Sequence, residues 1–98
     1  MARLDVYKLP NGQFVLDIQA AMLERLATRV VVPLALQTAT SPAVSELNPV
    51  FDIVGVPHVM LTHAIASILT RDLRHPIASL ARHHDAVTRA LDILLLGY

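Results

Sequence analysis

The stretch RHHDAVTRALDILLLGY, residues 82–98, has the periodicity of one amphipathic helix that runs almost to the C-terminus. Its apolar positions recur in steps of three and four, the spacing that brings side chains onto one helix face. That face consists of Leu80, His84, Val87, Leu91, Leu94 and Tyr98. We therefore expect a C-terminal helix that packs on the core, with His84 as a core or interface histidine.

The opposite face of this helix changes character near its end. It carries charges of alternating sign and then a leucine: Arg82, Asp85, Arg89, Asp92 and Leu96. Alternating charges at these spacings are typical of a solvated face. A helix that only covers a core needs no apolar residue there, yet Leu95 and Leu96 stand side by side. Periodicity alone favours a frayed terminus or a dimer contact over the alternative, a partner-binding tip.

The N-terminal region has a different period, of two residues. Leu4 and Val6 alternate with polar residues, and Phe14, Leu16 and Ile18 do the same. This alternation predicts two half-buried strands. Pro10-Asn11-Gly12 stands between them, and Asn-Gly tolerates the positive φ values of a tight turn. The segment therefore predicts a β-hairpin.

The middle of the chain is less regular. Residues 20–28 are either a short helix or a long connection that displays Met22 and Leu23. Residues 29–35 contain three consecutive valines and predict a strand that is buried on both faces or lies at a barrel seam. Pro33 lacks an N–H donor, so we expect it at an edge or a bulge. Residues 37–45 are rich in Ser, Thr, Ala and Pro and predict a surface loop.

Residues 48–62 predict a second hairpin. We expect Phe51 and Ile53 to pair with Val59 and Leu61, with the returning strand beginning at Pro57. Residues 63–69 are ambiguous between strand and helix, and the polar residues 70–76 predict a link. Short antiparallel strands followed by one helix indicate a small twisted or barrel-like sheet with the helix packed on it.

Composition limits the function classes. The chain of 98 residues is 54% hydrophobic and only 16% charged, which predicts one domain, residues 1–98, that buries apolar surface as a homodimer. Its net charge is zero and it has no Lys/Arg run, which argues against direct nucleic-acid binding. No apolar run is long enough for a membrane span. The lack of cysteine and of a signal-peptide pattern suits a cytoplasmic protein.

Signals for catalysis or metal binding are weak. His83 and His84 are adjacent and would point about 100° apart on a helix, so they cannot chelate one ion together. No phosphate-binding loop or nucleophile motif is present. A cluster of basic and acidic residues at 71–75 could support ribonuclease chemistry, but a solvated link explains it better. The residues alone therefore indicate a β-rich dimer with an interaction role and no cofactor.

Taken as a set, several short motifs resemble the CcdB toxins of bacterial toxin–antitoxin pairs. They are Val6-Tyr7, Leu16-Asp17-Ile18-Gln19, Arg29, Val32-Pro33-Leu34, Leu47, Pro49, Thr62, Ala66-Ser67, Ala90-Leu91-Asp92 and the penultimate Gly97. Their order and spacing cover nearly the whole chain. The resemblance implies an SH3-like antiparallel β-barrel with a C-terminal α-helix, in the mainly β (α+β) class.

The same resemblance implies a homodimeric toxin that is not an enzyme. CcdB toxins bind the A subunit of DNA gyrase and trap the enzyme on cleaved DNA. A cognate CcdA-like antitoxin neutralises them through a disordered segment that folds on binding. The gyrase-binding positions implied for this chain are Met22, Leu23, Asp92, Leu95, Leu96, Gly97 and Tyr98.

At three of these positions the chain departs from the pattern of the best-known members. Leu96 stands where they carry a tryptophan, Asp92 replaces an uncharged amide, and Tyr98 replaces a small aliphatic terminus. Two alternatives therefore stay open. One is a CcdB-like protein without gyrase poisoning, either a degenerate toxin that only dimerises and binds its antitoxin or a retargeted toxin. The other is a ribonuclease related to MazF, a toxin with a similar barrel, with its chemistry in residues 71–75.

Overall fold

The computed structural model of the chain describes residues 3–38 and 46–97. In chain order its elements are β1 (Asp5–Lys8), β2 (Phe14–Asp17), the 3-10 turn η1 (Ala21–Leu23), β3 (Thr28–Leu36), β4 (Val50–Ile53), β5 (Val56–Met60), η2 (Thr62–Ala64), β6 (Ala66–Leu69), η3 (Thr70–Asp72), β7 (Pro76–Ser79), η4 (Ala81–His83) and α1 (His84–Leu96). The expected loop at residues 37–45 lies largely outside the described residues.

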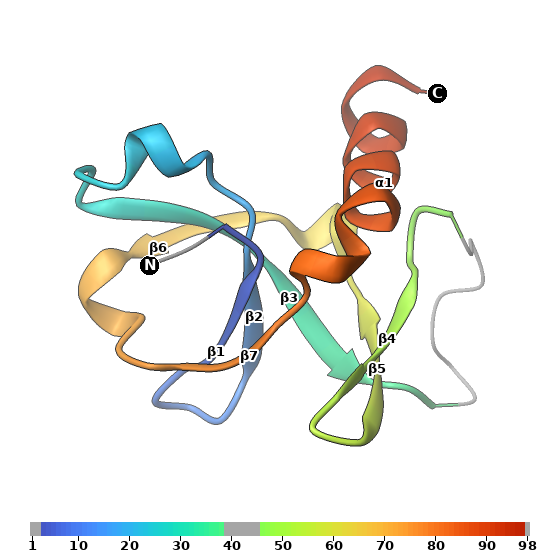
Figure 1. The fold of residues 1–98 in the computed structure, drawn as a ribbon, viewed down its shortest axis with the longest axis horizontal. Coiled ribbons are helices and arrows are strands. Elements are labelled where there is room, and N and C mark those ends of the chain that lie inside the picture. The colour runs from blue at the N-terminus through green and yellow to red at the C-terminus, as the bar shows by residue number, and fades with distance from the viewer. Residues whose placement is uncertain (1–2, 39–45, 98) are drawn as a thin grey trace.

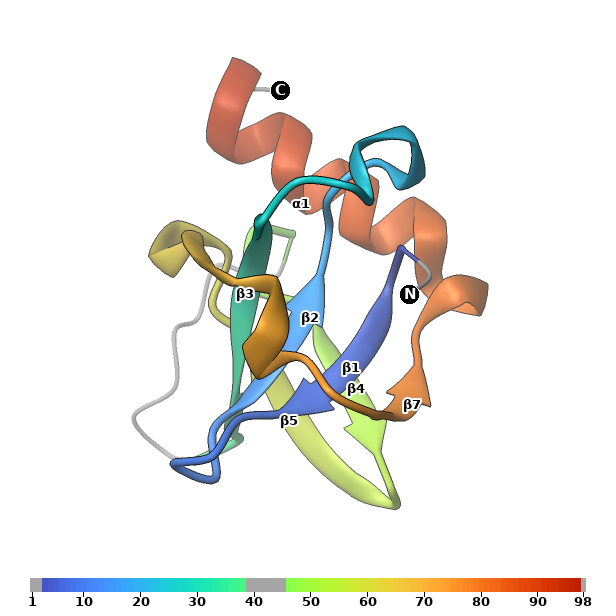
Figure 2. The same cartoon turned by 90° about the vertical axis from the view of Figure 1, so that its left-hand side faces the viewer.

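The strands form one strongly curled antiparallel sheet with α1 against it (Figures 1 and 2). The strand order is β4-β5-β3-β2-β1-β7, and β6 also pairs with β3. The long β3 connects the two parts of the sheet. One of its sides pairs with β2, and its other side pairs first with β6 and then with β5. This arrangement confirms the predicted class, a mainly β barrel-like sheet with a C-terminal helix.

Pro33 lies in the middle of β3, opposite Val15 of β2, and so the expectation of an edge or a bulge is wrong. Its carbonyl accepts a hydrogen bond from the Leu61 N–H at 2.9 Å. In a strand, the N–H and C=O of one residue point to the same side. The missing donor of Pro33 therefore faces the gap where β3 exchanges its partner β6 for β5, and no ladder bond is lost.

The first hairpin forms as predicted. Val6 of β1 faces Leu16 of β2, and Gly12 at the turn has a φ of 87°. The Leu9 N–H donates to the Gln13 carbonyl at 2.8 Å, which closes the loop. The Asn11 side-chain oxygen accepts from the Gln13 N–H at 2.9 Å, a local bond of the kind that makes Asn favourable in turns.

The second hairpin exists, but its predicted register is wrong. Phe51 faces His58 and Ile53 faces Val56, so β5 begins one residue before Pro57. The turn has two central residues, Val54 and Gly55, with φ values of 52° and 79°. Two consecutive positive φ values characterise the type I′ turn, which fixes the register of its strands. Val54 is an unusual residue for this position, and this is why the sequence did not reveal the turn.

Two apolar clusters lie on opposite faces of the sheet. The larger one includes Leu4, Val6, Leu16, Ile18, Val32, Leu34, Phe51, Ile53, Met60, Leu80, Val87 and Ala90. The smaller one consists of Tyr7, Val15, Val31 and Leu73, with Leu9 and Ile68 beside it. β2 is therefore buried on both faces, and the expectation of a half-buried strand is wrong there. The segment from β6 to β7 supplies Ile68 and Leu73, which cover the second face.

The C-terminal helix begins at His84, after the turn η4, and only Val87 and Ala90 are fully buried on it. His84 has an exposed side chain, so its predicted place in the core of this chain is wrong. His83 instead packs on Phe51, with ring centroids 4.9 Å apart. None of the helices formed by residues 3–38 and 46–97 has the length and apolar character needed to cross a membrane.

Candidate functional site

The end of α1 projects beyond the sheet, as Figure 1 shows. Leu95 is 69% exposed, Leu96 is 60% exposed, and Asp92 is exposed beside them. Gly97 ends the helix with a φ of 80°, and its N–H donates to the carbonyls of Asp92 and Ile93 at 3.2 and 3.0 Å. This left-handed glycine cap stops the helix directly after the two leucines. We call Asp92, Leu95, Leu96 and Gly97 the helix tip; Tyr98 lies outside the described residues.

The second part of the predicted surface is the connection between β2 and β3. Residues 20–28 contain only one 3-10 turn, η1, and no α-helix. Of the two predictions for this segment, the long connection is therefore correct and the short helix is wrong. Met22 is 86% exposed and Leu23 is 43% exposed. An apolar pair held in water on a short turn is costly unless a partner covers it. We call residues 20–27 the display loop.

The helix tip and the display loop stand at the same end of the molecule. Figures 1 and 2 both place them along the upper edge, above the curled sheet. Figure 1 also shows them as two separate projections rather than one continuous patch. Within one chain, the helix tip and the display loop are therefore two separate apolar projections on the same side of the molecule. A partner that binds this side can contact both.

A buried charged group lies beneath the display loop. Asp17 is 0% exposed and Arg29 is 1% exposed, and the Arg29 Nε and Nη2 atoms donate to Asp17 Oδ2 at 3.1 and 2.6 Å. Tyr7 lies in the same sheet, and burial, reinforced by Asp5 and Asp17, raises its pKa above the usual 10.0. The opposing effect of Arg29 is smaller. These groups stabilise one geometry of the β1–β2–β3 region and are too enclosed to act on a substrate.

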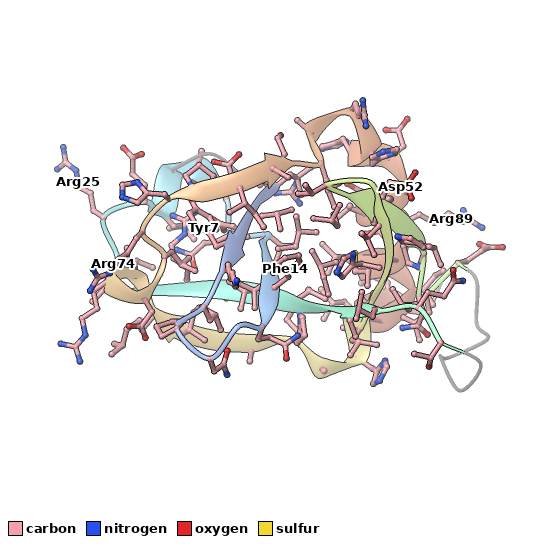
Figure 3. The ribbon with its side chains drawn as sticks, turned by 90° about the horizontal axis from the view of Figure 1, so that it is seen from below. Tyr7, Phe14, Arg25, Asp52, Arg74 and Arg89 are labelled. Atoms are coloured by element: carbon pink, nitrogen blue, oxygen red, sulfur yellow. The ribbon has the colours of Figure 1, made fainter. Side chains whose placement is uncertain are left out.

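The cluster at residues 71–75 is exposed at its basic positions, Arg71, Arg74 and His75. The structure adds Arg25 to this end of the molecule, which the sequence did not indicate. Thr70 donates through its N–H to Ala27 O at 2.8 Å, so the display loop and η3 are neighbours. Figure 3 shows Arg25 and Arg74 pointing outward at the same end. The arrangement is an exposed basic surface in which Asp72, the acidic member of the predicted cluster, is half-buried.

The histidines are dispersed over different elements. His58 is buried in β5, where its Nδ1 lies 2.9 Å from the Val56 carbonyl and its ring stacks on Phe14 at 5.1 Å. His63 lies in η2, and its Nδ1 is 3.3 Å from the Asn48 amide. Within the described part of the chain, no three His, Cys, Asp or Glu side chains come together as a metal site would require.

One open hollow of about 680 Å³ lies between the first hairpin turn, the end of β3 and the second hairpin. Its lining includes Phe14, Leu36, Val54 and His58. Figure 1 places these turns at the lower edge, opposite the helix tip and the display loop. The sequence did not predict it, because residues from three separate segments form it. It is distinct from the predicted surface.

Several solved structures share this fold. A Mycobacterium tuberculosis toxin described as MazF-mt6 superposes with a TM-score of 0.70 at 21% identity, over 93% of each chain. A structure described as an Mtb toxin gives 0.71 at 18% identity, over 88% of this chain and 94% of that one. An endoribonuclease from a mycobacterial species gives 0.75 at 16% identity, over 97% and 90%. At these identities the likeness establishes the fold alone.

The chain thus shares the small curled-barrel fold of these structures and carries an exposed apolar tip at the end of its helix. A family model described as CcdB protein matches residues 3–97, and the chain belongs to the CcdB family, the toxins of toxin–antitoxin pairs. Comparison with curated proteins finds no match. The family assignment agrees with the resemblance carried by the sequence motifs.

Proposed function

We propose that this protein is a toxin that binds the DNA gyrase A subunit and traps gyrase on cleaved DNA. The observation that carries the proposal is the helix tip, where Leu95 and Leu96 project into water beyond the body of the domain. Family membership supplies the target. The tip acts by contact rather than by a reaction of its own, and the proposal needs no cofactor.

The apolar area at the tip is large enough to matter for binding. Full burial of one leucine side chain contributes about 1.5–3 kcal/mol. Leu96 replaces the tryptophan of the best-known family members and offers less area and no aromatic face. A central tryptophan is often worth ~2 kcal/mol or more. We therefore expect tighter gyrase binding when Leu96 is replaced by tryptophan.

The proposal includes a homodimer and an antitoxin. In a twofold dimer, two helix tips would present one symmetric surface to a symmetric target. A CcdA-like antitoxin with a disordered segment would neutralise the toxin by folding on it. Family membership supports the antitoxin, and the apolar excess of the chain supports the homodimer.

The test measures the affinity of the purified protein for the gyrase A subunit by calorimetry. Leu96→Ser should weaken binding by about tenfold or more, because a buried leucine contact is lost. Leu36→Ser is the matched control, since Leu36 is 61% exposed but lies at the opposite end of the molecule. Deletion of residues 96–98 should also abolish toxicity without unfolding the protein. Leu36→Ser should bind as tightly as wild type. If Leu96→Ser also binds with wild-type affinity, the helix tip is rejected as the site.

The exposed basic surface near η3 supports a second candidate, a ribonuclease. Arg71, Arg74 and His75 are exposed and Arg25 stands at the same end, a surface suited to RNA phosphates. The purified protein should then cleave RNA without a partner, and Arg71→Ala or His75→Ala should abolish cleavage. Absence of RNA cleavage would remove this candidate. A degenerate toxin would instead be harmless alone yet bind its antitoxin tightly.

A further inference from the structure

The display loop has no apolar anchor. Every side chain of residues 20–28 is exposed, so packing does not determine the conformation of this segment. Its own backbone bonds are few. Leu23 N–H donates to Ala20 O at 3.0 Å, Glu24 N–H to Ala21 O at 3.2 Å and Leu26 N–H to Leu23 O at 3.1 Å. A single 3-10 turn of this kind is not stable by itself. Contacts from outside the loop must therefore hold Met22 and Leu23 in place.

Gln19 makes such contacts from beneath the loop, where it is 7% exposed. Its Oε1 accepts from the Val30 N–H at 3.0 Å. Its Nε2 donates to Leu23 O at 3.0 Å and to Thr28 O at 3.2 Å. One side-chain amide thus ties the η1 turn to the first residues of β3, across the full width of the loop.

The position of Gln19 is itself fixed by the buried ion pair. The Gln19 N–H donates to Asp17 Oδ1 at 3.0 Å, while Asp17 Oδ2 accepts from Arg29. Hydrogen bonds to a charged group are stronger than neutral ones. A continuous chain of hydrogen bonds therefore runs from Arg29 through Asp17 and Gln19 to the carbonyl of Leu23.

The other half of the loop has a separate tether. The Thr70 N–H donates to Ala27 O at 2.8 Å, and its Oγ1 donates to Leu26 O at 2.9 Å. Thr70 thus holds the part of the loop next to β3. Leu23 O accepts from the Leu26 N–H within the loop at 3.1 Å, and the Gln19 amide joins this carbonyl to the body of the protein.

We propose that Gln19 is a positioning residue that preorganises the display loop for a protein partner. Its amide fixes the Leu23 carbonyl and thereby presents Met22 and Leu23 in one conformation before the partner arrives. Preorganisation raises affinity because the loop loses less freedom on binding. This inference rests on the proposed function, since the gyrase A subunit is the partner used to test it.

The first experiment compares gyrase A affinities of two matched variants. Gln19→Met removes the amide while keeping side-chain length and should weaken binding about tenfold. Gln13→Met is the control, because the Gln13 amide also bonds backbone carbonyls, of Phe14 and Leu34, but lies at the opposite end. Gln13→Met should bind as wild type does. Wild-type affinity of Gln19→Met would overturn the proposal.

A second variant inverts the bond on which the proposal depends. Gln19→Glu keeps an acceptor for the Val30 N–H, but it turns a carboxylate oxygen toward the Leu23 and Thr28 carbonyls and adds a negative charge near Asp17. Circular dichroism establishes that the variant is folded, and the folded variant should bind gyrase at least as weakly as Gln19→Met. Wild-type affinity of a folded Gln19→Glu variant would equally overturn the proposal.

A double-mutant cycle separates positioning from general destabilisation. In a Met22→Ala/Leu23→Ala background, Gln19→Met should cause no further loss of affinity, because the side chains that it positions are gone. A purely structural role would weaken binding equally in both backgrounds and would contradict the proposal.

Amide hydrogen exchange tests the clamp without any partner. In Gln19→Met the amides of Leu23 and Glu24 should exchange about tenfold faster or more, while core amides such as Val32 keep their rates. Unchanged exchange in the loop would overturn the clamp. If wild type fails to bind gyrase while this exchange effect is present, the proposed target is wrong and the clamp stands.

Discussion

At the scale of single residues, the charged pair under the display loop controls stability. Asp17 and Arg29 are almost fully buried, and Asp17 also accepts the N–H of Gln19. Neither Arg29 Nη1 nor the Tyr7 hydroxyl has a hydrogen-bond partner within the described residues. The Asp17–Arg29 pair is therefore buried among groups that offer no replacement hydrogen bonds. Loss of either residue leaves the charge of the other buried and unpaired.

Asp17→Asn should destabilise the protein by about 3–5 kcal/mol, because it leaves the buried Arg29 charge unpaired. The double variant Asp17→Leu/Arg29→Met should recover much of that loss, since no buried charge remains. Urea unfolding followed by circular dichroism measures both. A double variant less stable than Asp17→Asn alone would contradict this account of the pair.

Tyr7 should ionise only above its ordinary pKa of 10.0, because burial raises the pKa of its phenol. The folded state then holds the phenolic proton more tightly than the unfolded chain. The resulting stability is fully present below about pH 10 and is lost as the pH rises through the folded pKa. In a Tyr98→Phe variant Tyr7 is the remaining tyrosine, so absorbance at alkaline pH reports it alone. Ionisation below pH 10 in the folded protein would refute the prediction.

At the scale of elements, the turn between β4 and β5 is strained. Val54 has a φ of 52° and is 72% exposed, so a β-branched residue occupies the left-handed region without compensating burial. Val54→Asn should stabilise the protein by about 1 kcal/mol, because Asn tolerates this region and suits a type I′ turn.

The melting temperature of Val54→Asn should exceed that of wild type by roughly 4–8 °C. Val56→Asn is the matched control, since Val56 is also exposed but lies in β5, where Asn is unfavourable. A Val54→Asn variant that melts at or below the wild-type temperature would show that the turn carries no strain.

The sequence was most informative where local chemistry alone determines the element. The Asn-Gly turn and the alternation around it predicted the first hairpin, and the steps of three and four predicted α1. The second hairpin was misregistered because Val54 gives no turn signal. Pro33 was misplaced because its environment, the exchange of β6 for β5 beside β3, is a property of the whole sheet.

The candidate surface was predictable only in part. The unexpected leucines at the end of a charged face indicated the helix tip, and Leu95 and Leu96 are indeed exposed. Gln19 was not recognised, because its bonds to Leu23, Thr28 and Val30 arise only when the loop folds back over it. The signals available were its place at the end of an alternating strand and in the motif Leu16-Asp17-Ile18-Gln19, and neither indicates which groups it bonds.

At the scale of the whole molecule, the exposed apolar residues are numerous for a small domain. Among residues 3–38 and 46–97, the large ones are Met22, Leu23, Leu26, Leu36, Val50, Val54, Val56, Leu69, Ile77, Leu95 and Leu96. Burial of such residues between two chains predicts a homodimer. Each chain has a mass of 10.7 kDa, and sedimentation equilibrium at micromolar concentration should give about twice that mass. A single species of the monomer mass would contradict the predicted homodimer.

The most direct test of the proposed function is a gyrase cleavage assay. Purified protein is incubated with gyrase from the source organism and supercoiled DNA, and linear DNA is measured after denaturation. We predict that linear DNA accumulates with wild type and with Leu36→Ser, needs about tenfold more protein or higher with Leu96→Ser, and does not accumulate after deletion of residues 96–98. Failure of the folded wild-type protein to produce linear DNA would contradict gyrase poisoning and favour a degenerate or retargeted toxin.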